Sequence, residues 1–137
     1  MENIKNIVYP EEFRSGYIKE HWDYKKDLED ILEKSGLINS FSGVYKQRLK
    51  WLEENKEDSI KRNKWFEKLK RAPDLYSMKF ERTAKNIRIL YAFVSYGKEI
   101  KAVLLYPFEE KEDTKRGQKS YSCAIEIAQR RLKEVKG

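Results

Sequence analysis

The chain of 137 residues contains one cysteine, Cys123, and one histidine, His21. A disulfide within the chain needs two cysteines and a structural zinc site needs a set of Cys and His ligands, so the sequence excludes both. No apolar run approaches the roughly 18 residues that a membrane-spanning helix needs. The first residues also lack the apolar stretch of a secretory signal. We therefore expect a cytoplasmic protein with no membrane partner.

Aromatic residues are frequent instead, at 13% of the chain within a hydrophobic share of 39%. Disordered chains lack this buriable area, so we expect the chain to fold. Its length favours a single domain over residues 1–137.

Charge is distributed unevenly along the chain. Residues 1–60 hold 10 Lys and Arg against 13 Asp and Glu, whereas residues 61–137 hold 20 against 10. The net charges are −3 and +10, so the whole basic excess lies in the second half. Such a half fits a polyanionic partner, most simply nucleic acid, and equally fits an ordinary solvated surface.

Helical spacing of apolar residues dominates the first half of the chain. It predicts a helix over residues 21–34 that ends at Ser35-Gly36, then one bent helix or two over residues 41–71. A short β-branched segment at residues 4–9 predicts a strand, placed at a sheet edge by Pro10.

From Leu75 the apolar period changes to two, which predicts a meander of three strands. The first strand is expected to be half-buried, the second to be central, and a turn at Ser95–Lys98 to join the last two. The strands are expected over residues 75–81, 86–94 and 100–108. A polar loop over residues 109–120 and a helix over residues 122–135 complete an α+β chain.

Arg88 is the clearest candidate for chemistry, because a guanidinium in an otherwise apolar strand needs an anionic partner or a cleft. A structural ion pair with Glu81 or Glu99 is the alternative. Lys79 lies on the adjacent strand. If its side chain emerges on the same face, two cations would bracket a phosphate-sized site.

A further group of polar residues follows the last strand. The expected loop supplies Lys111, Lys115, Arg116 and Lys119, and Tyr121 comes directly after it. Charged loops are usually only solvated. Their convergence with Arg88 and Lys79 near one concave sheet face predicts a site for a nucleic-acid backbone.

The second half resembles the RelE/ParE superfamily of bacterial toxins, in its HigB-like branch. The resemblance rests on residues 75–80 (LYSMKF), 86–93 (NIRILYAF), 104–108 (LLYPF, with Lys111 after it) and 121–124 (YSCA). It covers residues 64–134 as the family-like core and leaves residues 1–63 as a helical N-terminal extension. It implies an α+β fold in which N-terminal helices pack on a small curved antiparallel sheet, with a C-terminal helix.

The resemblance also implies an activity. Such toxins belong to type II toxin–antitoxin systems and cleave mRNA, commonly on the ribosome, as endoribonucleases that use no metal and no cofactor. Their partners are therefore a cognate antitoxin protein, mRNA and the ribosome.

The same resemblance gives roles to single residues. Arg88 would contact the scissile phosphate, and Lys79 would polarise the nucleophile or the phosphate. Lys115 or Arg116 would supply a second cation, and Lys111 and Lys119 would bind RNA. Tyr121 would stack on a base or transfer a proton.

Two departures from the family leave the chemistry open. Many HigB-like members have two lysines after the last strand, where this chain has Glu109-Glu110 and retains Lys111 alone. Tyr106 stands where histidine often occurs, so either proton transfer falls to Lys, Tyr or one of the two glutamates, or the protein is only weakly active. A ParE-like toxin that poisons gyrase, and a non-catalytic basic protein that binds nucleic acid or serves as an accessory, are the alternatives.

Overall fold

The computed structural model describes residues 4–80, 84, 86–110 and 114–137, apart from the side chains of residues 114–119. Within that part of the chain, every helix is too short or too polar to traverse a lipid bilayer. The elements in chain order are β1 (Ile4–Asn6), β2 (Ile18–His21), α1 (Tyr24–Lys34), α2 (Ser42–Asn55), a 3₁₀ helix η1 (Lys56–Lys61), β3 (Phe66–Lys68), β4 (Tyr76–Lys79), β5 (Ile87–Tyr96), β6 (Glu99–Glu109) and α3 (Thr114–Lys136).

The strands form one sheet in the order β1-β2-β6-β5-β4-β3. The β2–β6 pair is parallel and the other neighbouring pairs are antiparallel. The long β5–β6 hairpin lies at the centre, and β1 and β3 form the edges. The predicted meander, which is β4, β5 and β6, and the predicted edge position of β1 are confirmed.

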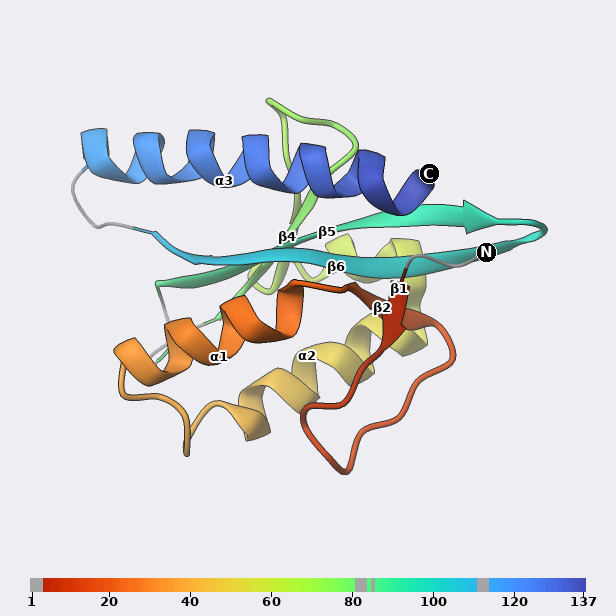
Figure 1. Ribbon diagram of the computed structural model, residues 1–137, viewed down its shortest axis with the longest axis horizontal. Coiled ribbons are helices and arrows are strands. Elements are labelled where there is room, and N and C mark those ends of the chain that lie inside the picture. The colour runs from red at the N-terminus through yellow and green to blue at the C-terminus, as the bar shows by residue number, and fades with distance from the viewer. Residues whose placement is uncertain (1–3, 81–83, 85, 111–113) are drawn as a thin grey trace.

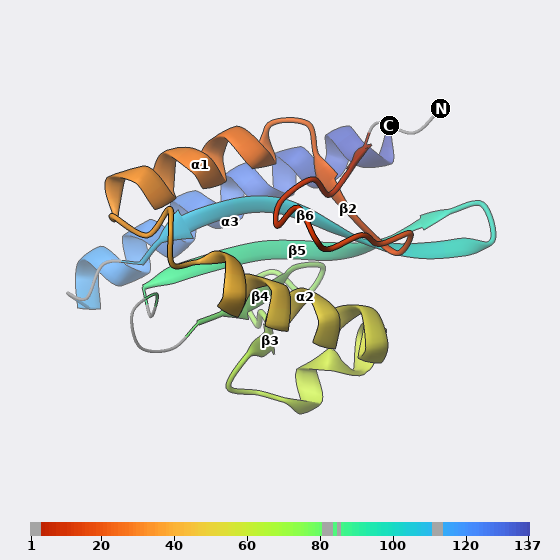
Figure 2. The ribbon, with the colours of Figure 1, turned by 90° about the horizontal axis from the view of Figure 1, so that it is seen from below.

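Helices cover both faces of this sheet. Figures 1 and 2 show α3 on one face and α1 and α2 on the other. Each face has its own core, one built with Leu28 and Leu49 of α1 and α2, the other with Ala128 and Leu132 of α3. The mixed α+β class with a C-terminal helix is therefore confirmed.

Strand β5 is buried on both sides, as its sequence predicts. Ile89 and Tyr91 belong to the core under α1 and α2, whereas Leu90 and Ala92 belong to the core under α3. Strand β4 is also covered on both sides, since Ser77 is completely buried. The expectation that Ser77 faces solvent was wrong, because Tyr121 of α3 covers it, whereas Lys79 on the same face is only half-buried.

Two predicted glycine positions end elements as expected. The α1 helix closes with Gly36 at φ +70°, where the Gly36 and Leu37 amides donate to the carbonyls of Glu33 and Leu32. Gly97, at φ +65°, forms the turn between β5 and β6.

The apolar stripe over residues 60–69 is not α-helical, and only its first residue, Ile60, lies in the 3₁₀ helix η1. The chain leaves α2 through η1 and then forms the edge strand β3. These residues form backbone hydrogen bonds with β4 and its flanks in place of helical ones. Lys79 N donates to Trp65 O at 2.7 Å, and Leu69 N donates to Leu75 O at 3.1 Å. Spacing within one segment cannot reveal a pairing partner that lies ten residues downstream.

The helix predicted over residues 21–34 begins three residues later, at Tyr24, and His21 instead ends the unpredicted strand β2. This strand is only Ile-Lys-Glu-His, without alternation of apolar residues. Its partner, β6, lies about 80 residues later in the sequence, so no local pattern predicts the pairing. Its Glu20 and His21 are nevertheless buried, and His21 Nε2 lies 2.8 Å from Glu134 Oε1 on α3.

The last helix is longer than predicted. Helix α3 begins at Thr114, so Lys115, Arg116 and Lys119 lie on its first turns and not in a loop. Lys111 lies outside the described residues. Apolar spacing does not predict this extension, because the residues of the first two turns are polar and include Gly117.

Glu20 makes stability depend on pH. Burial raises the pKa of its carboxyl from 4.5 to about 7, and Lys25 and Lys5 oppose that rise. Between these values the native state holds a proton that the unfolded chain releases. The free energy of unfolding therefore falls as pH rises through this range and is level above it.

We expect Glu20→Gln to raise the free energy of unfolding above pH 7 by about 1 to 3 kcal/mol, because it removes a buried charge. Urea unfolding across the range from pH 4.5 to pH 7 should show a flatter dependence than in the wild type. The exposed Glu33→Gln is the matched control and should leave the profile unchanged. A Glu20→Gln profile as steep as that of the wild type would contradict this assignment.

Candidate active-site cleft

Lys79 and Arg88 lie directly opposite each other on the antiparallel strands β4 and β5. Residues paired in this way project from the same face of a sheet. Arg88 alternates with Ile87 and Ile89, which point toward α1 and α2, so both cations lie on the face that α3 covers. The two side chains thus emerge on the same face of the sheet, which is the arrangement that a two-cation site requires.

Tyr121 reaches the same place from α3. Its hydroxyl lies 3.3 Å from Ser77 Oγ on β4. Its ring meets Phe108 of β6 edge to face, with centroids 4.9 Å apart. Contacts to two separate strands fix the phenol over the sheet, beside Arg88.

Lys79, Arg88 and Tyr121 together line an open cleft with a volume of about 440 Å³. Its remaining lining comes from the chain around β3, from the residue after β6 and from α3, namely Glu67, Leu69, Lys70, Arg71, Glu110 and Ile125. Four cations and two carboxylates therefore face one space. Its charge is net positive, as binding to a phosphate backbone requires.

Arg88 is held by Glu110, whose Oε2 lies 3.0 Å from Arg88 Nη2. The carboxylate is set in place because Glu110 N donates to Asn86 O at 2.7 Å, which continues the strand pairing past β6. Arg88 is 18% exposed and Glu110 29% exposed, so the pair lies at the cleft surface. Arg88 therefore forms an ion pair, as one alternative predicted, and Glu110 is a partner in it. Of the two partners predicted from the sequence, Glu99 instead pairs with Lys101, and Glu81 lies outside the described residues.

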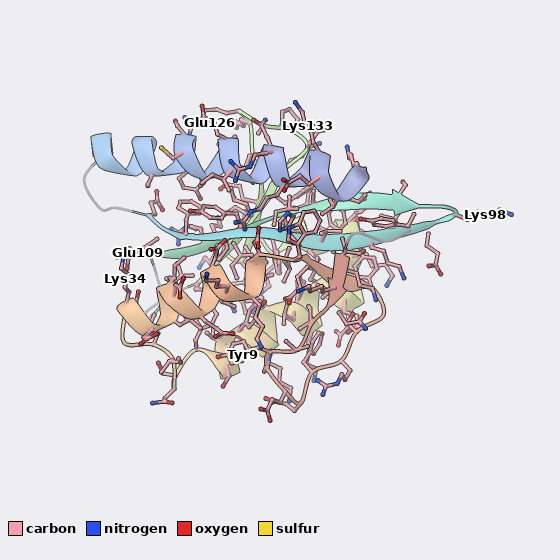
Figure 3. All side chains as sticks on the ribbon, viewed as in Figure 1. Tyr9, Lys34, Lys98, Glu109, Glu126 and Lys133 are labelled. Carbon is pink, nitrogen blue, oxygen red and sulfur yellow. The ribbon has the colours of Figure 1, made fainter. Side chains whose placement is uncertain are left out.

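Glu109 points away from the cleft. Ser35 Oγ, just after α1, donates to its Oε2 at 3.3 Å. Figure 3 shows Glu109 close to Lys34, at the end of the molecule opposite Lys98. Of the two glutamates after the last strand, only Glu110 lies where it can act on a group bound in the cleft.

The phenol of Tyr121 is protonated at neutral pH. Burial raises its pKa above the usual 10, while the Ser77 hydrogen bond and the positive charge of Arg88 partly offset that rise. A neutral phenol donates a proton or a hydrogen bond, so it suits an acid and not a base.

The sequence missed part of this cleft. Glu67, Lys70 and Arg71 were assigned to a helix, which hid their proximity to Lys79. The available signal was the basic run Lys68 to Arg71 just before Pro73. Of the other predicted residues, Lys111 is outside the described part of the chain. Lys115, Arg116 and Lys119 are placed only by the backbone of α3.

Among the residues whose side chains are described, no group of three or more His, Cys, Asp or Glu is arranged to hold a metal ion. Comparison of the chain with protein-family models, with curated proteins and with solved structures finds no match. The candidate site therefore stands on its own geometry.

The Tyr121–Ser77 contact should be measurable as a coupling between the two residues. Each of Tyr121→Phe and Ser77→Ala leaves a hydroxyl without this partner and should cost about 1 kcal/mol of unfolding free energy. The double variant should cost less than the two single costs combined, by about 0.5 to 1.5 kcal/mol, in urea unfolding experiments. Strictly additive costs would show that α3 is not anchored here.

Proposed function

We propose that the protein is a toxin-like endoribonuclease that cleaves single-stranded mRNA in the cleft lined by Lys79, Arg88 and Tyr121. The observation that carries the proposal is the meeting of these three groups, chosen from sequence, on separate elements around one net-positive space. Phosphoryl transfer needs cations near the phosphate together with a proton acceptor and a proton donor. The cleft contains residues suited to each role.

The proposed substrate is the RNA backbone. Lys70, Arg71, Lys79 and Arg88 supply the cations that attract phosphates, and two of them are arginines, which bind phosphate oxygens in pairs. An RNA phosphate that enters the cleft displaces the carboxylate of Glu110 from Arg88 and binds the guanidinium in its place. That exchange releases Glu110 for chemistry.

In the proposed reaction the ribose 2′-oxygen attacks the adjacent phosphorus. Glu110 accepts the 2′-hydroxyl proton while the new bond from oxygen to phosphorus forms. The bond from phosphorus to the 5′-oxygen breaks, and Tyr121 donates its proton to that leaving oxygen. Lys79 and Arg88 stabilise the charge on the phosphorane. The products are a 2′,3′-cyclic phosphate and a 5′-hydroxyl.

The biological setting of the proposal comes from the sequence resemblance to HigB-like toxins. In this proposal the nuclease acts in the cytoplasm on ribosome-bound mRNA, and a cognate antitoxin inhibits it.

Expression of the wild type in a bacterial host should arrest growth and create new transcript 5′ ends within minutes. Arg88→Ala should abolish both effects, because it removes the cation at the scissile phosphate. Arg130→Ala is the matched control, since Arg130 is an exposed arginine of α3 outside the cleft. Growth curves and 5′-end mapping provide the measurement.

Other outcomes identify the alternatives. Growth arrest and DNA damage with intact transcripts would contradict the nuclease proposal and favour a toxin that poisons gyrase. Full toxicity of Arg88→Ala would contradict the site, and no arrest by the wild type would favour a non-catalytic nucleic-acid-binding protein.

Glu110→Gln separates the two roles proposed for Glu110. Loss of the general base should lower RNA cleavage by about 10²-fold or more. Binding of a 2′-O-methylated RNA, which cannot be cleaved, should tighten because a negative charge leaves the cleft. Single-turnover cleavage and fluorescence anisotropy measure the two effects. Faster cleavage by Glu110→Gln would show that Glu110 only masks Arg88.

A further inference from the structure

A second basic pocket lies on the other side of the sheet edge from the cleft. We call it the Arg62 pocket; it lies between α2 and the segment that links η1 to β3, and its volume is about 660 Å³. Four cations line it, namely Arg48, Lys61, Arg62 and Lys64. Its described lining contains no carboxylate.

The indole of Trp65 holds the two arginines of this pocket. The guanidinium carbon of Arg62 lies 3.4 Å from the ring centroid and that of Arg48 lies 3.8 Å from it. Two guanidinium groups this close to one centroid must lie on opposite faces, because on one face they would overlap. Trp65 therefore has no face left for a nucleic-acid base, so the pocket is suited to an anionic group.

Arg48 makes the pocket a built site. Only 2% of this arginine is exposed. Its Nε donates to Lys79 O at 2.8 Å, and its Nη1 donates to Gln47 Oε1 at 2.9 Å. These bonds fix the guanidinium at the pocket wall before any ligand arrives, which lowers the entropy cost of binding.

The exposed cations of the pocket keep their charge for a ligand. Across the described ranges 4–80, 84, 86–110 and 114–137, no carboxylate forms an ion pair with Lys61, Arg62 or Lys64. Arg62 is positioned by aromatic rings, over Trp65 and 5.1 Å from the Trp51 centroid. A cation–π contact orients a guanidinium without neutralising it. Arg88 differs in this respect, because Glu110 already opposes its charge.

Lys79 connects the Arg62 pocket to the cleft. Its backbone amide donates to Trp65 O and its carbonyl accepts from Arg48, whereas its side chain lines the cleft. The two basic spaces thus lie on the two sides of the same short piece of backbone. A flexible polyanion that crosses the sheet edge at β3 would meet both.

We infer that the Arg62 pocket binds a backbone phosphate of the single-stranded RNA whose scissile phosphate lies in the cleft. The inference rests on the proposed function for its substrate class. It adds a subsite that anchors the RNA away from the reacting atoms and selects a chain long enough to span the edge of the sheet.

Binding of a fluorescent single-stranded RNA with 2′-O-methyl groups tests this subsite. Arg62→Gln should weaken binding about fivefold and reduce the slope of log affinity against log salt by about 0.7, the value for one lost phosphate contact on a single strand. Arg130→Gln should do neither. Lys61→Gln leaves both cation–π contacts of Trp65 intact, because Arg48 and Arg62 make them. It should also weaken binding, and it keeps the test valid if Arg62→Gln unfolds.

The variants distinguish this inference from the function on which it rests. If Arg62→Gln and Lys61→Gln bind RNA like Arg130→Gln while Arg88→Gln binds weakly, the subsite is overturned and the cleft stands. If Arg88→Gln alone leaves binding unchanged, the pocket stands and the cleft assignment fails. Polyglutamate that binds as tightly as RNA at equal ionic strength, and loses as much affinity in Arg62→Gln, would replace RNA by an acidic peptide and overturn the inference.

Discussion

The burial of β5 on both faces is the constraint on which the rest of the structure depends. With α1 and α2 on one side and α3 on the other, the buried residues of the strand alternate between two apolar cores. The side chain of Arg88 lies on the α3 side of the sheet, where it lines the cleft. The same alternation on β4 places Lys79 beside it. A shift of one residue in register would turn both cations into the opposite core.

The edge of the sheet at β3 joins two basic spaces that the chain builds differently. In the cleft, a carboxylate holds the central arginine, and a substrate phosphate must displace it. In the Arg62 pocket, an aromatic ring holds two arginines, and an anion need displace no described carboxylate there. The first arrangement suits a site where a proton must be moved. The second suits a site that only binds.

One ion pair and one hydrogen bond outside the cleft fix α3 relative to the first half of the chain. Arg131 of α3 lies 2.6 Å from Asp27 of α1 and also donates to Leu105 O, while Glu134 lies against His21. Arg131 thus joins α3 to α1 and β6, and Glu134 joins α3 to the end of β2. Asp27 from the acidic first half thus helps to position the helix that carries Tyr121.

The sequence by itself determined the three-stranded meander, the C-terminal end of α1, the hairpin turn, and the choice of Lys79, Arg88 and Tyr121. These features depend on local periodicity, on glycine conformation or on a charged residue in an apolar strand. Only the tertiary structure decided that β2 and β3 are strands, because each is short and gains its stability from a partner elsewhere in the chain. It also decided that Glu110, and not Glu109, faces Arg88, and that Arg48 from the acidic half joins Arg62 at Trp65. Contacts between distant segments leave no periodic trace in either segment alone.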